Sequence, residues 1–418
     1  MLNMFNTALT ALNANSTAID VTGHNLANLN TSGYKAGTVS FEELVTQDLS
    51  VDSSDINGNG IGAPVLSRQF TNGTVQVTGG LLDAAISGNG FFTVQGSDGN
   101  TYYTRAGNFK LDDSGNLVTA TGENVQGWMA TNGVASPGGV PTNISIPPGS
   151  ANAPVPSTFF GMNMNLNALG TVDGTNGTFT APVEVVDSLG TKHTLTATFT
   201  KTDTNAWKYD ISIDGGDVDG GTAGTPSSLA TGTLTFDTNG KLTAPAADAG
   251  SVEISLPAFA NGAGEQTVNW QLYDSAGASQ VTQYGEASAV NSNSGDGSTA
   301  AQLTQVVMGD GGKVMAKYSN GTQKLVAVVA LASIQNPDSL VAVGNNNYST
   351  TPASGPVSYG EAGTGTRGGI TANALESSNV DMARELTNII IYQRSYQANA
   401  RVITAGDEIS QEILSLKR

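Results

Sequence analysis

The first 29 residues carry apolar side chains at alternating intervals of three and four positions. Such spacing places side chains on one face of an α-helix, as in the a and d positions of a heptad repeat. The stripe comprises Leu2, Phe5, Leu9, Leu12, Ser16, Ile19, Gly23 and Leu26. It predicts a helix over roughly residues 2–29, about 40 Å long.

The C-terminal segment repeats this spacing and predicts a helix over residues 380–416. Its stripe comprises Met382, Leu386, Ile389, Gln393, Tyr396, Ala400, Ile403, Asp407, Ser410 and Leu414. Ser378 or Asn379 is expected to cap this helix, and Asp381 to favour the positive end of its dipole.

Two long apolar stripes at opposite ends of one chain allow two arrangements. Either the two helices pair with each other, or each helix packs on other subunits. Two ordinary helices on one globular core are the simpler alternative. The large apolar members of the stripes are candidate assembly residues: Leu2, Phe5, Leu9, Leu12, Ile19, Leu26, Met382, Leu386, Ile389, Tyr396, Ile403 and Leu414.

Between the predicted helices, short β-prone runs recur about every eight to ten residues, separated by Gly, Asn and Asp turns. Six prolines within residues 137–156 interrupt this pattern. A second block of alternating strands follows over about 155–285. The interior is therefore expected to be β, with a second β-domain inserted between two halves of the first.

The expected fold class is mixed: mainly β interior domains, with N- and C-terminal α-helices pairing as a coiled-coil-like domain. Four parts are predicted. They are a terminal helical domain (1–40 plus 370–418), a connecting segment (41–72), a first β-domain (73–150 plus 286–369) and an inserted outer β-domain (151–285).

The charge balance narrows the possible functions. The 418 residues include 35 Asp+Glu, 17 Lys+Arg and no Cys, for a net charge of −18. Binding nucleic acid requires clustered basic residues, so this class is disfavoured. Without Cys there are no disulfides, thiol nucleophiles or Cys-ligated metals. No apolar run is long enough to span a membrane, and the N-terminus lacks the pattern of a cleavable signal peptide.

Patterns suggestive of catalysis or metal binding favour structural explanations. Gly363, Gly365 and Gly368 match G-x-G-x-x-G, but no helix follows directly, which favours a flexible linker. Asp214, Asp217 and Asp219 do not have the spacing of a calcium loop and are expected to be solvated turn carboxylates. His24 and His193 are expected to be structural. No catalytic residue, metal or cofactor is predicted.

Three blocks resemble motifs of the bacterial flagellar rod and hook proteins. The first is residues 23–35, the second joins 86–92 with 103–109, and the third joins 375–381, 385–386 and 392–400. The matching motif residues are Asn25, Asn28, Thr31, Gly33, Tyr34, Lys35, Asn379, Tyr392, Gln393, Arg394, Tyr396 and Asn399.

Hook-type members of this family have an additional β-domain where block 155–285 lies. The resemblance thus implies a structural subunit that polymerises into the flagellar hook, a curved tube that transmits motor torque as a flexible joint. Glycine-rich tracts at 139–155 and 360–369 are candidate joints within the subunit. A distal-rod or other axial protein and a secreted β-rich adhesin are the alternatives.

The resemblance also implies partners and a location. Copies of the chain form the polymer, the rod lies at the proximal end, and hook-cap and hook–filament junction proteins lie at the distal end. A flagellar type III apparatus would export the chain without a cleaved signal, to an extracellular position in the flagellum.

Overall fold

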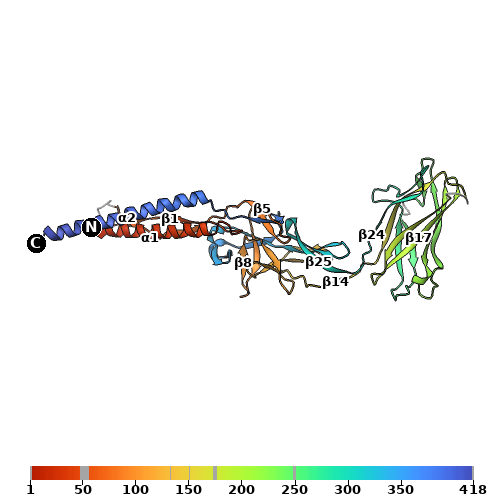
Figure 1. Cartoon of the computed structure of the whole chain (residues 1–418), viewed down its shortest axis with the longest axis horizontal. Coiled ribbons are helices and arrows are strands. Elements are labelled where there is room, and N and C mark those ends of the chain that lie inside the picture. The colour runs from red at the N-terminus through yellow and green to blue at the C-terminus, as the bar shows by residue number, and fades with distance from the viewer. Residues whose placement is uncertain are drawn as a thin grey trace. The chain divides into compact units, whose positions relative to one another are not determined.

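The computed structural model describes residues 2–47, 56–131, 133–149, 151–172, 177–247 and 251–416. The chain divides into two compact units. Unit 1 comprises residues 1–148, 305–317 and 323–418, and unit 2 comprises residues 149–304 and 318–322. The fold is mainly β with a helix at each end, which confirms the predicted fold class (Figure 1). The finer four-part division stays a prediction.

The two helices of unit 1, α1 (Leu2–Ala27) and α2 (Met382–Leu416), lie side by side (Figure 1). Gly406, near the end of α2, lies against Met4 at the start of α1. Ala18 of α1 and Glu385 of α2 line one cleft nearer the opposite end of the pair. The helices are therefore antiparallel, and the predicted pairing is confirmed.

Asp381 is the N-cap of α2, which corrects the prediction of Ser378 or Asn379. Its Oδ1 accepts hydrogen bonds from the backbone nitrogens of Ala383 at 2.9 Å and Arg384 at 3.2 Å. These are the second and third residues of the helix, as N-capping requires. The Asn379 side chain instead bonds to a segment far away in sequence, so the helix begins two residues later than predicted.

The segment after α1 forms two antiparallel strand pairs in unit 1. Strand β1 (Gly37–Ser40) pairs with β4 (Val65–Arg68), and β2 (Glu43–Gln47) pairs with β3 (Ile56–Ile61). Strands β1 and β3 contact α1. Part of the predicted connecting segment therefore lies along the helix pair.

The C-terminal segment leading to α2 pairs with the start of the first β region. Strand β5 (Val75–Val77) pairs with β33 (Ala374–Glu376), and β6 (Ala84–Ser87) pairs with β32 (Gly369–Ala372), both antiparallel. Residues nearly 300 positions apart are thus adjacent, which places the N- and C-terminal motifs side by side.

The largest sheet follows the order β25-β26-β27-β11-β7-β8-β30-β29 after β14, with further strands paired at its sides. Buried aromatic side chains, among them Phe91, Tyr103 and Tyr348, form a core beside it. Its strands are β7 (Phe91–Gln95), β8 (Thr101–Thr104), β9 (Phe109–Leu111), β10 (Leu117–Thr119), β11 (Asn124–Thr131), β12 (Val134–Ala135), β13 (Thr142–Asn143), β14 (Ala151–Asn152), β25 (Ala301–Gly309), β26 (Lys313–Tyr318), β27 (Gln323–Val329), β28 (Leu331–Ile334), β29 (Val341–Gly344), β30 (Asn347–Ser349) and β31 (Val357–Gly360).

Unit 2 is built around two five-stranded sheets with a shared apolar core. One sheet has the order β16-β17-β18-β19-β20, and the other has β21-β22-β15-β23 with β24 beside β15. Trp207 and Trp270 are fully buried in the core. The strands are β15 (Phe159–Asn167), β16 (Thr178–Val186), β17 (Lys192–Asp203), β18 (Ala206–Asp214), β19 (Pro226–Phe236), β20 (Leu242–Ala244), β21 (Ser251–Leu256), β22 (Gln266–Gln271), β23 (Val281–Tyr284) and β24 (Ala289–Gly295).

The chain enters and leaves unit 2 along neighbouring backbone segments. Ala301 and Asn152 are antiparallel partners. Val155 and Ser298 exchange two backbone hydrogen bonds of 2.9 Å. Unit 2 is therefore inserted through a two-stranded ribbon.

Candidate assembly site

The face of α1 that is buried within the chain is made of small residues. Ala8, Ala11, Ala14 and Ala18 are buried there. These alanines have helical spacing, but most of them come one position before a member of the predicted stripe, so they lie on a different face of α1. Small side chains let helices approach closely, so this alanine face accounts for the packing of α1.

The predicted apolar stripe is mostly left at the surface or half-covered. Leu9 is 53% exposed and Leu386 is 45% exposed, whereas Ile19 is half-buried. Met382 and Tyr396 are exposed, Phe5, Leu12, Leu26, Ile389 and Ile403 are half-buried, and the side chains of Leu2 and Leu414 lie outside the described residues. The stripe is thus available to a second molecule.

Further apolar side chains on α2 are exposed beyond the predicted stripe. Ile390 is 51% exposed, and Ile391, Val402 and Ile409 are exposed as well. At 100° per residue, Leu386 and Ile390 lie on one flank of the helix, and Ile391, Val402 and Ile409 on the other. The helix therefore presents apolar surface on both flanks of the side that packs on α1.

Asn25 connects the end of α1 to the strand that follows it. Its Nδ2 donates to Gly37 O and its Oδ1 accepts from Gly37 N, both at 2.8 Å. The Tyr34 hydroxyl donates to the same Oδ1 at 3.3 Å. Because Asn25 is buried, this paired bonding satisfies its amide and fixes the turn between α1 and β1.

Asn379 performs the same function from the C-terminal side. Its Oδ1 accepts from Ala36 N at 2.8 Å, and its Nδ2 donates to Gln69 O at 2.8 Å and to Thr71 Oγ1 at 3.0 Å. The Asn379 amide therefore links the segment before α2 both to the residue that precedes β1 and to the segment that follows β4.

A buried ion cluster joins the three sequence blocks. Lys35 Nζ lies 2.6 Å from Glu376 Oε1, and Arg105 Nη1 lies 3.1 Å from Glu376 Oε2. Lys35 and Glu376 side chains are fully buried, and Arg105 is nearly so. Two cations share one carboxylate, so the cluster has a formal charge of +1.

Backbone groups complete the cluster. Lys35 Nζ also donates to Thr71 O at 2.8 Å, Arg105 Nη2 donates to Gly88 O at 2.8 Å, and Gly73 N donates to Glu376 Oε1 at 2.8 Å. Burial lowers the pKa of Lys35 and of Arg105, and the negative charge of Glu376 opposes the shift in both. Glu376 thus favours the charged form of Lys35 and offsets the cost of burying the Arg105 charge.

Gly33 is required by its backbone geometry. Its φ is +70°, and a Cβ there would lie 2.5 Å from Ala106 N. Its own N donates to Glu376 O at 2.8 Å. The turn after α1 is therefore tightly packed on the Arg105 segment and on the cluster.

The remaining motif residues do not join this junction. Asn28 bonds back to His24 O and accepts from Thr31. Asn399 bonds to Ser395 O. Gln393, Arg394 and Tyr396 are exposed on α2, and the Tyr392 ring packs edge-on against Phe41 at 6.1 Å.

Sequence reasoning missed Arg105 and Glu376 as site residues, although both lie in the recognised blocks. A single sequence does not reveal that a charged residue is buried, so only the motif could have pointed to them.

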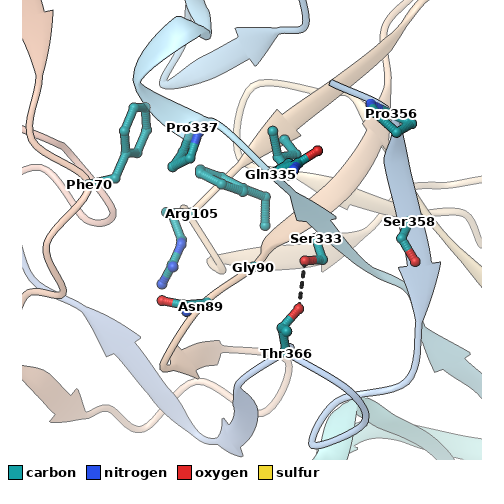
Figure 2. Close-up of a pocket in the computed structure, with 12 residues that line it drawn as sticks. Phe70, Asn89, Gly90, Arg105, Ser333, Gln335, Pro337, Pro356, Ser358 and Thr366 are labelled. Carbon is teal, nitrogen blue, oxygen red and sulfur yellow. Dashed lines mark hydrogen bonds between the residues drawn. The ribbon is translucent and has the colours of Figure 1, made fainter. Parts of the chain in front are cut away.

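Arg105 also lines a cavity of about 470 Å³ (Figure 2). Phe70, Phe91 and two prolines contribute apolar surface, and a Ser333–Thr366 hydroxyl pair at 2.9 Å crosses one side. Arg105 is the one ionisable side chain among the lining residues. The cavity thus offers no acid–base pair.

The glycine-rich tract at 360–369 is a hydrogen-bonded loop between β31 and β32, which corrects the expected linker. Gly363 N donates to Gly368 O at 2.9 Å, and Arg367 Nη2 donates to Thr364 Oγ1 at 3.0 Å. The whole tract lies inside unit 1, whereas the tract at 139–155 spans the boundary between the units.

His193 is buried in unit 2, between two carboxylates. Its Nε2 lies 3.0 Å from Asp187 Oδ2, its Nδ1 lies 3.4 Å from Asp217 Oδ2, and its ring stacks on Phe259 at 4.2 Å. Burial raises the pKa of Asp187, but hydrogen bonds led by those from Asn261 and His193 outweigh it and lower this pKa to about 2.

The other candidate polar residues are in ordinary positions. Asp214 caps a short turn by accepting from Gly216 N and Gly224 N, and His24 is exposed on α1. Within the described residues, no group of three or more His or acidic side chains is placed to hold a metal ion. Neither described helix is both long and apolar enough to cross a membrane.

Four family descriptions match successive parts of the chain. They are the "Flagella basal body rod protein" (residues 5–35), "Flagellar hook protein FlgE/F/G D1 domain" (85–174), "Flagellar basal body protein FlaE D2 domain" (165–298) and "Flagellar basal body rod FlgEFG protein C-terminal" (371–416).

Full-length relatives agree with these matches. The chain is 34% identical to the flagellar hook protein FlgE of Escherichia coli K12, over 99% of this chain and 100% of that protein. It is 30% identical to the flagellar hook protein FlgE of Borreliella burgdorferi, over 100% of both. The crystal structure of Helicobacter pylori flagellar hook protein FlgE2 matches 72% of this chain and 100% of its own, with TM-score 0.51 and 15% identity. That structure supports the fold alone.

Proposed function

Because this chain belongs to the flagellar hook protein family, we propose that it polymerises into a curved tube that acts as a flexible joint between motor and filament. The protein is a structural subunit and not an enzyme. Its location is the flagellar hook, outside the cell.

The exposed apolar surface of the helix pair carries this proposal. Leu9 on α1 and Leu386, Ile390 and Ile409 on α2 are about half exposed, although α1 buries four alanines on its other face. Several large exposed apolar side chains gathered on one helix pair indicate an interface. An open helical polymer arises when one patch binds a different patch on the next copy.

The proposed arrangement places the helices of unit 1 in the inner tube and the β regions outside. Net charge supports it: residues 41–375 carry 28 acids and 11 bases, whereas the terminal segments are nearly neutral. Like charge accumulates when many copies pack closely, so the nearly neutral ends suit the crowded tube.

Further partners follow from the position of a hook. The rod is expected at the proximal end, the hook cap and the hook–filament junction proteins at the distal end, and a type III apparatus is expected to export the chain without a cleaved signal. These remain proposals.

Electron microscopy of a strain with an in-frame deletion of the gene tests this function. An intact rod that lacks the hook is the expected result, and complementation restores curved tubes. Loss of the rod instead would favour a distal-rod protein. Intact flagella with lost surface attachment would favour an adhesin.

A point variant separates assembly from folding. Leu386→Asp is expected to abolish tubes while leaving the monomer's circular dichroism unchanged, because Leu386 is exposed in the monomer. Leu386→Met, which keeps an apolar side chain at the same position, is the matched control and is expected to assemble.

A further inference from the structure

Glu385 is a mostly buried residue whose carboxylate has no partner among the described residues. It is 8% exposed and lines a cleft of about 270 Å³ between α1, α2 and β1. Among the described residues, no ion pair or hydrogen bond reaches its carboxylate. The carboxylate oxygens keep access to solvent through this cleft, so a cation can reach them there and form a charge-assisted hydrogen bond.

The same helix carries unpaired cations on its opposite face. Arg394 and Arg401 are exposed, and neither makes an ion pair within the described residues. At 100° per residue they lie about 180° and about 160° around α2 from Glu385. A chain cannot bring opposite faces of one straight helix together, so these groups meet only across molecules.

We propose that the Glu385 cleft of one subunit receives an outward guanidinium, from Arg394 or Arg401, of a second copy's α2. This inference rests on the proposed function, since it requires a polymer. Complementary groups on opposite faces of one element are what a head-to-tail contact needs, because each subunit then offers an acceptor on one side and a donor on the other. A two-fold dimer would instead use one patch twice.

The two arginines imply different offsets between neighbours. Arg394 is nine residues beyond Glu385 and Arg401 is sixteen residues beyond it, or about 14 Å and about 24 Å along the helix axis. Neighbouring copies of α2 are therefore displaced along the tube by one of these distances. Arg384 lines the same cleft and is the intramolecular rival as the partner of Glu385.

Cysteine cross-linking tests the contact, since the chain has no cysteine of its own. Full-length double variants Glu385→Cys/Arg394→Cys and Glu385→Cys/Arg401→Cys are assembled and treated with a bis-maleimide. Its length replaces that of the arginine and glutamate side chains, which are too long for a direct disulfide between the two positions. Denaturing electrophoresis is then expected to show a ladder of linked subunits for one of the pairs. Within one chain the two positions of each pair lie on opposite faces of α2, so the linker joins different molecules.

Control variants identify each outcome. Glu385→Cys/Glu412→Cys is expected to give no ladder. A ladder for neither arginine pair in intact tubes overturns the inference but leaves the proposed function standing. A dimer from Glu385→Cys alone also overturns it, because it indicates a two-fold contact. If no wild-type tubes form, the proposed function fails instead.

Neutral variants provide a second test that does not depend on the length of a cross-linker. Glu385→Gln is expected to raise the critical concentration for assembly roughly ten-fold, as expected for a charge-assisted hydrogen bond. A double variant that combines Glu385→Gln with Arg→Gln at the arginine that makes the contact is expected to raise the critical concentration little further. If Arg384→Gln reproduces the effect of Glu385→Gln and neither outer arginine does, the partner is intramolecular and the inference is wrong.

Discussion

Among single residues, Glu376 has the largest structural role, because two buried cations depend on its carboxylate. Lys35 and Arg105 reach it from segments 341 and 271 residues away in sequence. A buried pair contributes modest net stability, but removing one partner leaves the other charge uncompensated. Loss of the Glu376 carboxylate would leave two buried cations, Lys35 and Arg105, without a counter-charge.

The Glu376→Gln variant is therefore expected to lose about 3–5 kcal/mol of the free energy of unfolding of unit 1. Urea unfolding followed by helical circular dichroism measures it. Glu42→Gln is the control, since Glu42 is exposed in the same unit and its neutralisation should cost less than about 1 kcal/mol. Equal losses in both variants would refute the role given to Glu376.

The Asp187–His193 pair predicts an acid response of unit 2. The pKa of Asp187 is lowered to about 2 in the folded state, from an ordinary value of about 4. This group therefore stabilises the fold above about pH 4, and that contribution, on the order of 2 kcal/mol, is lost as the pH falls towards about 2.

The fluorescence of Trp207 and Trp270 reports unfolding of unit 2. The Asp187→Asn variant is expected to be less stable at neutral pH and to lose less stability between about pH 4 and about pH 2 than the wild type. Glu253→Gln, an exposed change in the same unit, should follow the wild-type profile. An unchanged profile for Asp187→Asn would contradict the assignment.

At the scale of single residues, the sequence predicted the site residues best where the family motif includes residues that the turn after α1 needs. Asn25, Gly33, Lys35 and Asn379 were selected from the motif, and they meet at one junction. Asp381 was assigned a role at the helix dipole and not the cap, because Ser378, Asn379 and Asp381 are all capping residue types. Tertiary contacts decide between them: the Asn379 side chain bonds to distant segments and is not free to cap α2.

Among the elements, α1 shows how a periodic pattern predicts a helix without predicting which face is buried. The large apolar residues and the alanines have the same period, offset by one residue. Larger residues suggest the core, yet the alanines form it, because close packing within the chain favours small side chains. The predicted stripe is left exposed or half-buried in the single chain.

Overpacking the alanine face tests this division. Ala14→Leu is expected to destabilise the helix pair by about 1–3 kcal/mol, because Ala14 is buried and well packed. Ser16→Leu, on the exposed side of α1, should leave the monomer's thermal unfolding nearly unchanged. The reverse order of effects would mean that the larger stripe is the buried face.

At the scale of the whole molecule, unit 2 is an insertion with adjacent ends. The proline-rich break and the return of strand periodicity predicted an inserted domain from the sequence. The ribbon of Val155 and Ser298 was not predicted, because pairing between distant short strands leaves no local signal. The same holds for β5 with β33 and β6 with β32.

Excision of unit 2 tests its independence. Replacing residues 156–297 with Asn-Gly should close the ribbon as a hairpin, since this dipeptide favours the two-residue turn that joins antiparallel strands. Unit 1 is expected to keep its helical circular dichroism and its resistance to urea. Loss of the helices would show that unit 1 requires unit 2 to fold.

The junction of Lys35, Arg105 and Glu376 also imposes an order of events on a chain that emerges end to end from a narrow passage. If the N-terminus emerges first, Lys35 waits through 341 further residues for Glu376, and Arg105 waits through 271. If the C-terminus emerges first, Glu376 waits through 271 residues for Arg105 and through 341 for Lys35. On the proposed route of export, the cluster that anchors the end of the helix pair would therefore close only after most of the chain has been delivered.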